Sequence, residues 1–174
     1  MRVICPYTRL ATETKASLDA SGYPWEAVDV SGSSTAYADL LDGLWAKGET
    51  FCLVEHDMVP RDDTLKALDD CPEGWCGFVY RHPVPTATTP YQELAGLGCT
   101  RFRSELMARF PDMMTRSHAN YARDGWNRRY WANCDERIYL ELTRLAVPRH
   151  EHGPAITHLH TSSPGQQSLS PAWW

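Results

Sequence analysis

The sequence lacks any long apolar run and any excess of basic residues. No hydrophobic stretch approaches the roughly 18 residues that a membrane-spanning helix needs, so we expect no membrane span. Residues 1–5 lack the apolar core of a secretory signal and instead have the pattern of a buried β-strand. The net charge of −5 argues against general polyanion binding, although a local basic patch could still contact nucleic acid. We therefore expect a cytoplasmic protein.

The sequence also lacks the C-x2-C spacing of zinc knuckles. Four residues separate Cys71 from Cys76, and His82 follows, but we do not assign zinc to this group. Most of the six cysteines stand in apolar segments, as buried free thiols do, and we interpret them as core residues. They are Cys5, Cys52, Cys71, Cys76, Cys99 and Cys134.

What is present is an alternation of apolar patterns with periods of two and of 3.6 residues, which predicts strands and helices in turn. The clearest helix begins near Tyr37 and ends before Gly48, a residue that commonly follows the last turn. The predicted strands are 3–5, 25–30, 50–54, 74–80, 94–99 and 155–160, and the other predicted helices are 12–21, 62–68, 103–110 and 135–146. Residues 81–92 and 111–131 are predicted to be irregular.

This order predicts an α/β fold with a mostly parallel central sheet flanked by helices, because βαβ units join parallel strands by right-handed crossovers. At 174 residues the chain is expected to form a single domain, residues 1–161, with a loose tail at 162–174. Trp173 and Trp174 end that tail and raise the question of an oligomer contact.

An acid-x-acid pair, Glu55 and Asp57, follows the apolar strand 50–54. Ligands of open α/β sheets bind at the carboxyl ends of strands, and carboxylates there can hold a divalent cation that in turn holds phosphates. The alternative for Asp57 is a turn or helix cap ahead of Pro60.

Two histidines, His158 and His160, alternate along the last predicted strand and therefore point to the same face. His150 and His152 repeat this spacing upstream. Together with the acid-x-acid pair, His158 and His160 are candidate ligands for Mn²⁺ or Mg²⁺, since an oxygen-rich shell with one imidazole suits these ions. Ordinary surface or core histidines are the other interpretation.

With its elements in this order, the chain resembles the GT-A glycosyltransferases, particularly the inverting family-2-like group. The resemblance extends over roughly residues 3–160 and rests on several segments in the family's order. They are 3–9, 28–34 with its Asp-x-Gly-Ser turn, 41–57 ending in a DxD-like motif, the glycine segment 96–98, the ED-like 131–136, and the late histidines of 157–160.

The resemblance implies a Rossmann-like nucleotide-binding sandwich in which residues 1–60 bind a nucleotide diphosphate sugar, with a UDP-sugar favoured. Residues 74–161 would then bind the acceptor. The implied nucleotide-sugar contacts are Pro6, Tyr7, Arg9, Asp29, Ser31, Gly32, Ser33, Glu55 and His56. Asp29 and the serine turn also have the plain interpretation of a solvated strand end and loop.

The ED-like motif implies that Asp135 or Glu136 is the catalytic base that takes a proton from the acceptor hydroxyl, with Asp135 preferred. Either residue could instead be an acid that stabilises a helix start. Segment 116–131 mixes arginines with Tyr and Trp, and it is the candidate acceptor surface for a carbohydrate or a modified base of nucleic acid. A solvated loop is its other interpretation.

The chain departs from the family at Glu55, which stands where the first Asp of the DxD is expected, and it lacks the QxxRW motif of processive synthases. We therefore expect transfer of a single sugar, with inversion. A nucleotidyltransferase of related fold is one alternative, although residues 5–9 lack the glycines that grip a triphosphate. A non-catalytic nucleotide-sugar-binding module is the other. The sugar, the base and the acceptor are left open.

Overall fold

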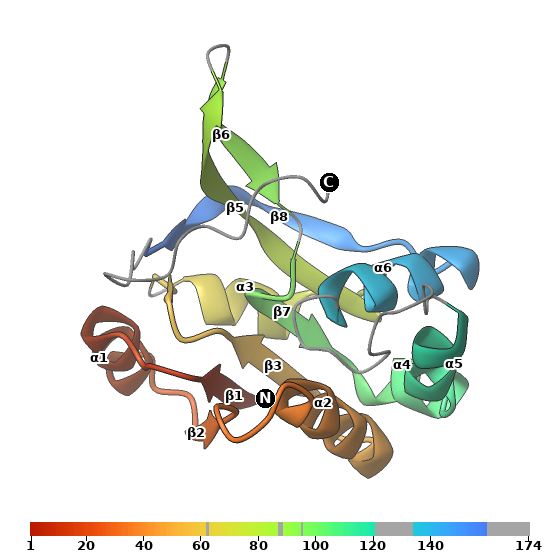
Figure 1. Ribbon diagram of the computed structural model, residues 1–174. Coiled ribbons are helices and arrows are strands. Elements are labelled where there is room, and N and C mark those ends of the chain that lie inside the picture. Colours follow the sequence, from red (N-terminus) through yellow and green to blue (C-terminus); the bar gives the residue numbers. More distant parts are fainter. Residues whose placement is uncertain (62, 87–88, 95, 121–133, 160–174) are drawn as a thin grey trace.

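The computed structural model describes residues 1–61, 63–86, 89–94, 96–120 and 134–159, which form a mixed β-sheet with helices on both faces (Figure 1). The strands are β1 (Arg2–Tyr7), β2 (Trp25–Asp29), β3 (Phe51–Val54), β4 (Met58–Val59), β5 (Trp75–Thr86), β6 (Thr89–Leu94), β7 (Cys99–Phe102) and β8 (His150–His158). The helices are α1 (Thr12–Ala20), α2 (Ala36–Lys47), α3 (Thr64–Asp70), α4 (Ser104–Arg109), α5 (Met113–Asn120) and α6 (Cys134–Arg144). No helix in the described ranges has the length and hydropathy that a membrane crossing requires.

Period-two alternation along the central strands sends successive side chains into two separate cores. Ile4 and Leu53 pack on one face, in a core that includes residues of α2, α4, α5 and α6. Val3 and Val54 pack on the other face, in a core that includes residues of α1 and α3. The molecule is therefore a three-layer sandwich, which agrees with the predicted α/β class.

The sheet is mixed, so the prediction of a mostly parallel sheet is wrong. The strand order is β2-β1-β3-β7-β5-β8-β4, with β6 paired to β5. The pairs β1–β2, β1–β3 and β5–β8 are parallel, whereas β7 runs antiparallel to both β3 and β5. The direction reverses because β5 and β6 form an antiparallel hairpin and the chain then returns as β7.

That hairpin corrects two sequence predictions. Residues 81–92 were expected to form a loop, but β5 continues to Thr86 and β6 begins at Thr89. Proline is tolerated where a strand lacks one neighbour. Among the described strands, β6 with Pro90 pairs with β5 alone, and β5 beyond Tyr80 pairs with β6 alone. The prolines of this segment therefore do not prevent a ladder. The next strand also lies later than the predicted 94–99, at Cys99–Phe102.

Residues 111–131 were predicted to be irregular, and this prediction is wrong for Met113–Asn120, which form helix α5. Residues 121–133 lie outside the described part.

The first half of the chain agrees closely with prediction. Helix α2 ends at Gly48, whose φ of 67° is the left-handed conformation that glycine adopts without strain. The sequence predicted one domain, residues 1–161, followed by a tail at 162–174. The last fifteen residues of the chain lie outside the described part, so this division stays a prediction.

The sheet must curl around the segment that joins β3 to β4. These strands stand four positions apart in the hydrogen-bonded order, which would be about 19 Å in a flat sheet. The chain from Val54 to Met58 can span at most about 14 Å. Residues 55–57 therefore bridge the open side of a curled sheet, between a central strand and an edge strand.

Candidate functional site

Asp57 and His158 meet at the curled side of the sheet. The Nε2 atom of His158 lies 3.1 Å from Oδ2 of Asp57, and their side chains are 14% and 18% exposed. The contact joins the loop after β3 to the end of β8, 101 residues later. One carboxylate and one imidazole from distant parts of the chain are thus held together at a place that solvent can still reach.

Backbone pairing of β4 with β8 fixes this approach. Met58 is opposite His158 in the antiparallel register, and the amide of Leu159 donates to the carbonyl of Asp57 at 2.7 Å. The ring of Tyr80 packs edge-on against the His158 ring, with centroids 5.0 Å apart. The imidazole is therefore held by its strand, by an aromatic neighbour and by the carboxylate.

The electrostatics of the loop favour a charged carboxylate at Asp57. Burial alone would raise the pKa of Asp57, but the hydrogen bond and charge of His158, with the charge of His56, outweigh it and lower the pKa below its usual range. Nearby, burial raises the pKa of the Cys5 thiol to about 12, and the charges of Glu55 and Asp57 add to the shift. The end of β1 therefore lies within reach of both carboxylates.

Glu55 is held differently from Asp57. Its Oε1 accepts a hydrogen bond of 2.8 Å from the hydroxyl of Tyr37, a buried residue in the first turn of α2. Its amide donates to the carbonyl of Gly98 at 2.8 Å, so the glycine segment 96–98 lies beside the acid-x-acid motif. The two acids thus have different partners, Glu55 on the α2 side and Asp57 on β8.

The predicted nucleotide contacts gather at the carboxyl ends of β1 and β2. Tyr7 is opposite Asp29 in the parallel register, and the amide of Val30 donates to the Tyr7 carbonyl at 2.9 Å. The Asp29 carboxylate accepts a 2.8 Å hydrogen bond from the amide of Ser31, and contacts with Ser31 lower the pKa of Asp29. The remaining members of this group are the buried Pro6 and the exposed Arg9, Gly32 and Ser33.

The loop after β1 is tied to the acid-x-acid segment. The amide of Ala11 donates to the carbonyl of His56 at 3.0 Å, so residues 8–11 lie against residues 55–57. Three strand ends, those of β1, β2 and β3, therefore lie at one end of the sheet, and the ligand site that the sequence places there stays a prediction.

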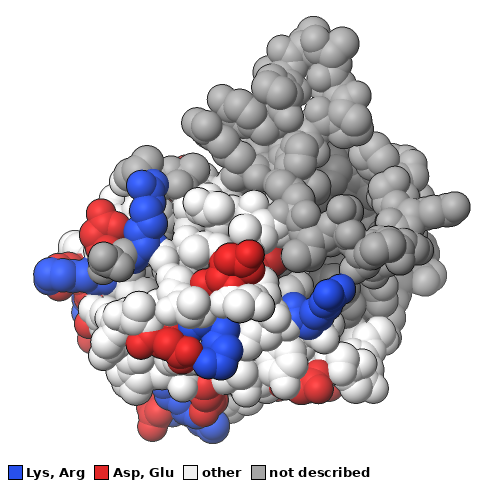
Figure 2. All heavy atoms as spheres, turned by 90° about the vertical axis from the view of Figure 1, so that its left-hand side faces the viewer, with Lys and Arg blue, Asp and Glu red and all other residues white. Residues whose placement is uncertain are grey.

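Acidic and basic side chains are interspersed on the face that Figure 2 shows. Among the residues drawn there in colour, no broad area carries a single sign of charge. Arg116, the first arginine of the predicted acceptor segment, belongs to a different part of the molecule, helix α5, and pairs at 2.7 Å with Asp112, which directly precedes that helix. The described part of this face therefore does not resemble a general nucleic-acid surface.

The other predicted site residues are only partly placed. Asp135 and Glu136 belong to the start of α6, but their side chains are outside what the structure describes. His160 and residues 121–131 of the acceptor segment also lie outside the described residues.

Sequence reasoning missed Tyr37 and Tyr80, which contact Glu55 and His158. Tyr37 was recognised only as an apolar residue of a helical stripe, and its hydroxyl gave no separate signal. Tyr80 ends the predicted strand 74–80, and only the pairing of β5 with β8 brings it to His158.

No protein-family model matches the sequence, and no curated protein matches it significantly. Among solved structures, the chain is similar to a glycosyltransferase involved in the glycosylation of the major capsid of PBCV-1. The TM-score is 0.50 at 12% sequence identity, over 88% of this chain and 82% of that chain. At this identity the likeness concerns the fold alone.

Two further solved structures align less well. One is A197 from STIV, with a TM-score of 0.44 at 13% identity over 62% of this chain and 66% of that chain. The other is a protein of Bacillus anthracis assigned as a glucose-1-phosphate thymidylyltransferase, with a TM-score of 0.45 at 10% identity over 92% of this chain and 72% of that chain.

Proposed function

We propose that the protein is a metal-dependent GT-A glycosyltransferase that transfers one sugar from a nucleotide diphosphate sugar to an acceptor hydroxyl, with inversion. The observation that carries this proposal is the contact of Asp57 with His158 at the edge where the parallel strands end. The shared fold of a glycosyltransferase supports it.

The Asp57–His158 geometry suits a divalent cation. In octahedral coordination with bonds of about 2.1 Å, adjacent ligand atoms lie about 3 Å apart. Oδ2 of Asp57 and Nε2 of His158 are 3.1 Å apart, so both atoms could bind one ion with little movement. Mn²⁺ and Mg²⁺ fit a shell of this kind, completed by Glu55 or His160 or by phosphate oxygens. A bound cation would neutralise charge on the departing nucleotide diphosphate.

The ends of β1 and β2 are the proposed binding surface for the nucleoside. The exposed carboxylate of Asp29 would accept hydrogen bonds from the base, and the backbone of Ser31–Ser33 precedes α2, where amides can approach a phosphate or ribose. Tyr7 and Arg9 border this surface from β1, and the Ala11–His56 hydrogen bond joins it to the cation ligands. A UDP-sugar is the donor that we favour.

The acceptor would bind on the side of residues 74–161. Asp135, with Glu136 as second choice, would take the proton from the attacking hydroxyl at the start of α6. A base opposite the departing diphosphate gives inversion. The acceptor segment 116–131 would contact a carbohydrate or a modified base.

The test is donor turnover by the Asp57→Ala variant in the presence of Mn²⁺. Loss of a cation ligand should lower release of nucleotide diphosphate by at least about 100-fold, because a catalytic cation supplies several kcal/mol of stabilisation. Asp70→Ala, which removes an exposed carboxylate paired with Lys66, is the matched control and should keep full activity. Equal turnover by Asp57→Ala and the parent would overturn the metal assignment.

The same assay separates the alternatives. A nucleotidyltransferase would release pyrophosphate from a nucleoside triphosphate and a sugar phosphate, and it would leave nucleotide diphosphate sugars intact. A binding module would show a donor-dependent rise in melting temperature without any release of nucleotide diphosphate.

A further inference from the structure

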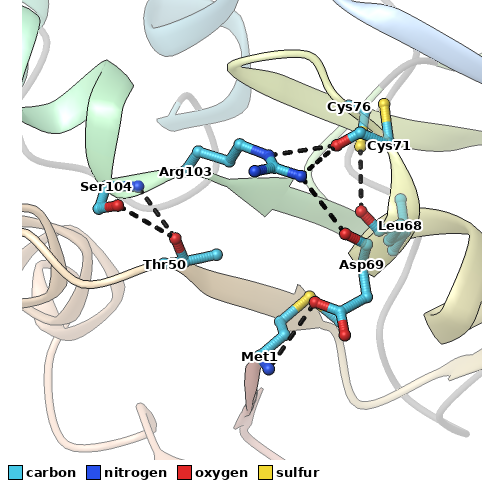
Figure 3. Close-up of polar contacts among 8 residues, drawn as sticks. All are labelled: Met1, Thr50, Leu68, Asp69, Cys71, Cys76, Arg103 and Ser104. Atoms are coloured by element: carbon cyan, nitrogen blue, oxygen red, sulfur yellow. Dashed lines mark hydrogen bonds and ion pairs between the residues drawn. The ribbon is translucent and has the colours of Figure 1, made fainter.

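A second group of metal-ligand side chains lies away from the Asp57–His158 pair, where α3 leads into β5. Cys71, Cys76 and His152 each offer one ligand atom, and these atoms all lie within 4.8 Å of one another. Figure 3 shows the two cysteine side chains next to each other in this turn. Nothing in the proposed sugar transfer uses these residues.

The fold brings the histidines to the cysteines through the parallel pairing of β5 with β8. His150 is opposite Cys76 in that register, and His152 is opposite Phe78. Because His150 and His152 are two residues apart on a strand, they share one face. Nδ1 of His150 lies 3.1 Å from Sγ of Cys71, which adds a fourth candidate ligand.

Two arginines hold the cysteine-bearing turn in place. The guanidinium of Arg103 donates to the carbonyl of Cys71 at 2.6 Å (Figure 3), and that of Arg101 donates to the carbonyl of Glu73 at 2.8 Å. The turn between the two thiols is therefore held by Arg101 of β7 and by Arg103, which directly precedes α4, independently of any ion. Such preorganisation is typical of a built metal site.

One polar atom of this cluster lacks the hydrogen bond that a buried polar group normally makes. Nε2 of His152 is buried and has no hydrogen-bond partner among the described residues, while the ring stacks on Phe78 with centroids 5.2 Å apart. A buried ring nitrogen without a partner is costly, and a metal ion would satisfy it. The second ring, the exposed His150, lies 4.6 Å from His152 between centroids, so the two imidazoles are direct neighbours.

The charge of Arg101 also fits a thiolate. Arg101 is 1% exposed, and one of its Nη atoms lies 3.2 Å from Sγ of Cys76. A hydrogen bond from a buried cation to sulfur stabilises the thiolate form that a metal requires. Two thiolates together with Zn²⁺ are neutral, so occupancy would bury no additional net charge.

We propose that Cys71, Cys76, His150 and His152 form a structural Zn²⁺ site. Sulfur and imidazole ligands select zinc over Mn²⁺ or Mg²⁺, which prefer oxygen. Tetrahedral zinc places its ligand atoms about 3.4–3.8 Å apart, so the ligand atoms of Cys71, Cys76 and His152, now within 4.8 Å of one another, need only close slightly. His150 joins the site through Nδ1, which lies 3.1 Å from Sγ of Cys71. The ion would tie the α3–β5 turn to the start of β8 and close a chain segment of 79 residues.

The first experiment uses the full-length protein, purified under reducing conditions with added zinc and then freed of loose metal. Elemental analysis should find about one zinc per chain. Replacement by Co²⁺ should give the strong visible bands of a tetrahedral ion and the near-ultraviolet charge-transfer absorption of two thiolates. A protein that takes up no zinc, or a weak cobalt spectrum without charge transfer, would overturn the proposal.

The second experiment compares variants. Cys71→Ser, Cys76→Ser and His152→Ala should each weaken zinc affinity by at least about 100-fold, whereas Cys134→Ala, a buried cysteine of the opposite core, should retain the ion. Zinc retained in all three ligand variants would contradict the site. Asp57→Ala should keep its zinc even if it loses donor turnover, so failure of the zinc site and failure of the proposed sugar transfer are distinguishable.

Discussion

Gly98 lies against Met58 so closely that the glycine leaves no room for a side chain. A Cβ at Gly98 would overlap the end of Met58 and would approach Tyr80 at 3.2 Å. Met58 follows Asp57 directly and is opposite His158, and Tyr80 contacts the His158 ring. The glycine segment that the sequence singled out is thus a packing support for the candidate site.

Gly98→Ala should destabilise the fold by about 1–3 kcal/mol, the usual effect of overpacking a filled core. It should also weaken binding of Mn²⁺, because the displaced Met58 and Tyr80 flank Asp57 and His158. Gly43→Ala is the matched control: Gly43 is in α2, and an added Cβ meets nothing within 4 Å. That variant should gain about 0.5–1 kcal/mol from helix propensity. Denaturant titration measures the free energy of unfolding of both variants, and an equal change in the two would contradict the packing argument.

His158→Gln should reduce the stabilisation that Mn²⁺ confers. The amide can still reach Asp57, but it is a poorer ligand than imidazole, so half-maximal stabilisation should require at least about tenfold more Mn²⁺. Thermal unfolding across a Mn²⁺ series measures this. Asp19→Ala removes an exposed pair with Lys15 and a hydrogen bond from Trp25 but no candidate ligand, so its Mn²⁺ midpoint should match that of the parent. An unchanged midpoint in His158→Gln would remove His158 from the cation shell.

Low pH should lower the free energy of unfolding, in part because Asp57 becomes protonated. Its pKa is lowered in the folded protein, so its contribution to the free energy of unfolding is present above the ordinary value of 3.8 and is lost as the pH falls through the lower folded value. In Asp57→Asn this loss is absent, so the free energy of unfolding should fall less steeply below about pH 4 than in the parent. Urea titrations at several acidic pH values measure the two slopes, and parallel slopes would show that the carboxylate is not stabilised by its neighbours.

Tyr37→Phe should lower the free energy of unfolding by about 1 kcal/mol, since it removes the hydrogen bond to Glu55 and keeps the buried ring. For a chain of this size the melting temperature should fall by about 2–4 °C. Tyr139→Phe is the control, because Tyr139 is 41% exposed and its change should leave the melting temperature nearly unaltered. Equal melting temperatures for Tyr37→Phe and the parent would mean that the hydroxyl holds Glu55 without net stabilisation.

The first half of the fold was predictable because its signals are local. Helix α2 has a complete apolar stripe and a terminal glycine, and β3 is a short apolar run before two acids. The hairpin of β5 and β6 was hidden by its prolines, which are usually read as loop. The direction of β7 depends on that hairpin, so the mixed sheet could not be inferred from periodicity alone.

The residue types of the candidate site could be predicted from the sequence, but the contacts between these residues could be predicted only in part. That the loop at Asp57 and the strand at His158 come together follows from the pairing of β4 with β8, and a strand of two residues leaves almost no pattern in the sequence. The Cys71–Cys76 group was set aside because its spacing is not the C-x2-C of zinc knuckles, and the histidine considered with it was His82. The histidine that lies beside the two cysteines is His152, and only the register of β5 with β8 reveals this.

The supply of His158 by a strand so late in the chain has a consequence for biosynthesis. A ribosome that has translated β3 and β4 exposes Asp57 long before its imidazole partner exists, because 101 codons separate the two. Any product released by premature termination in that interval would retain the first βαβαβ segment yet lack the ring that faces Asp57.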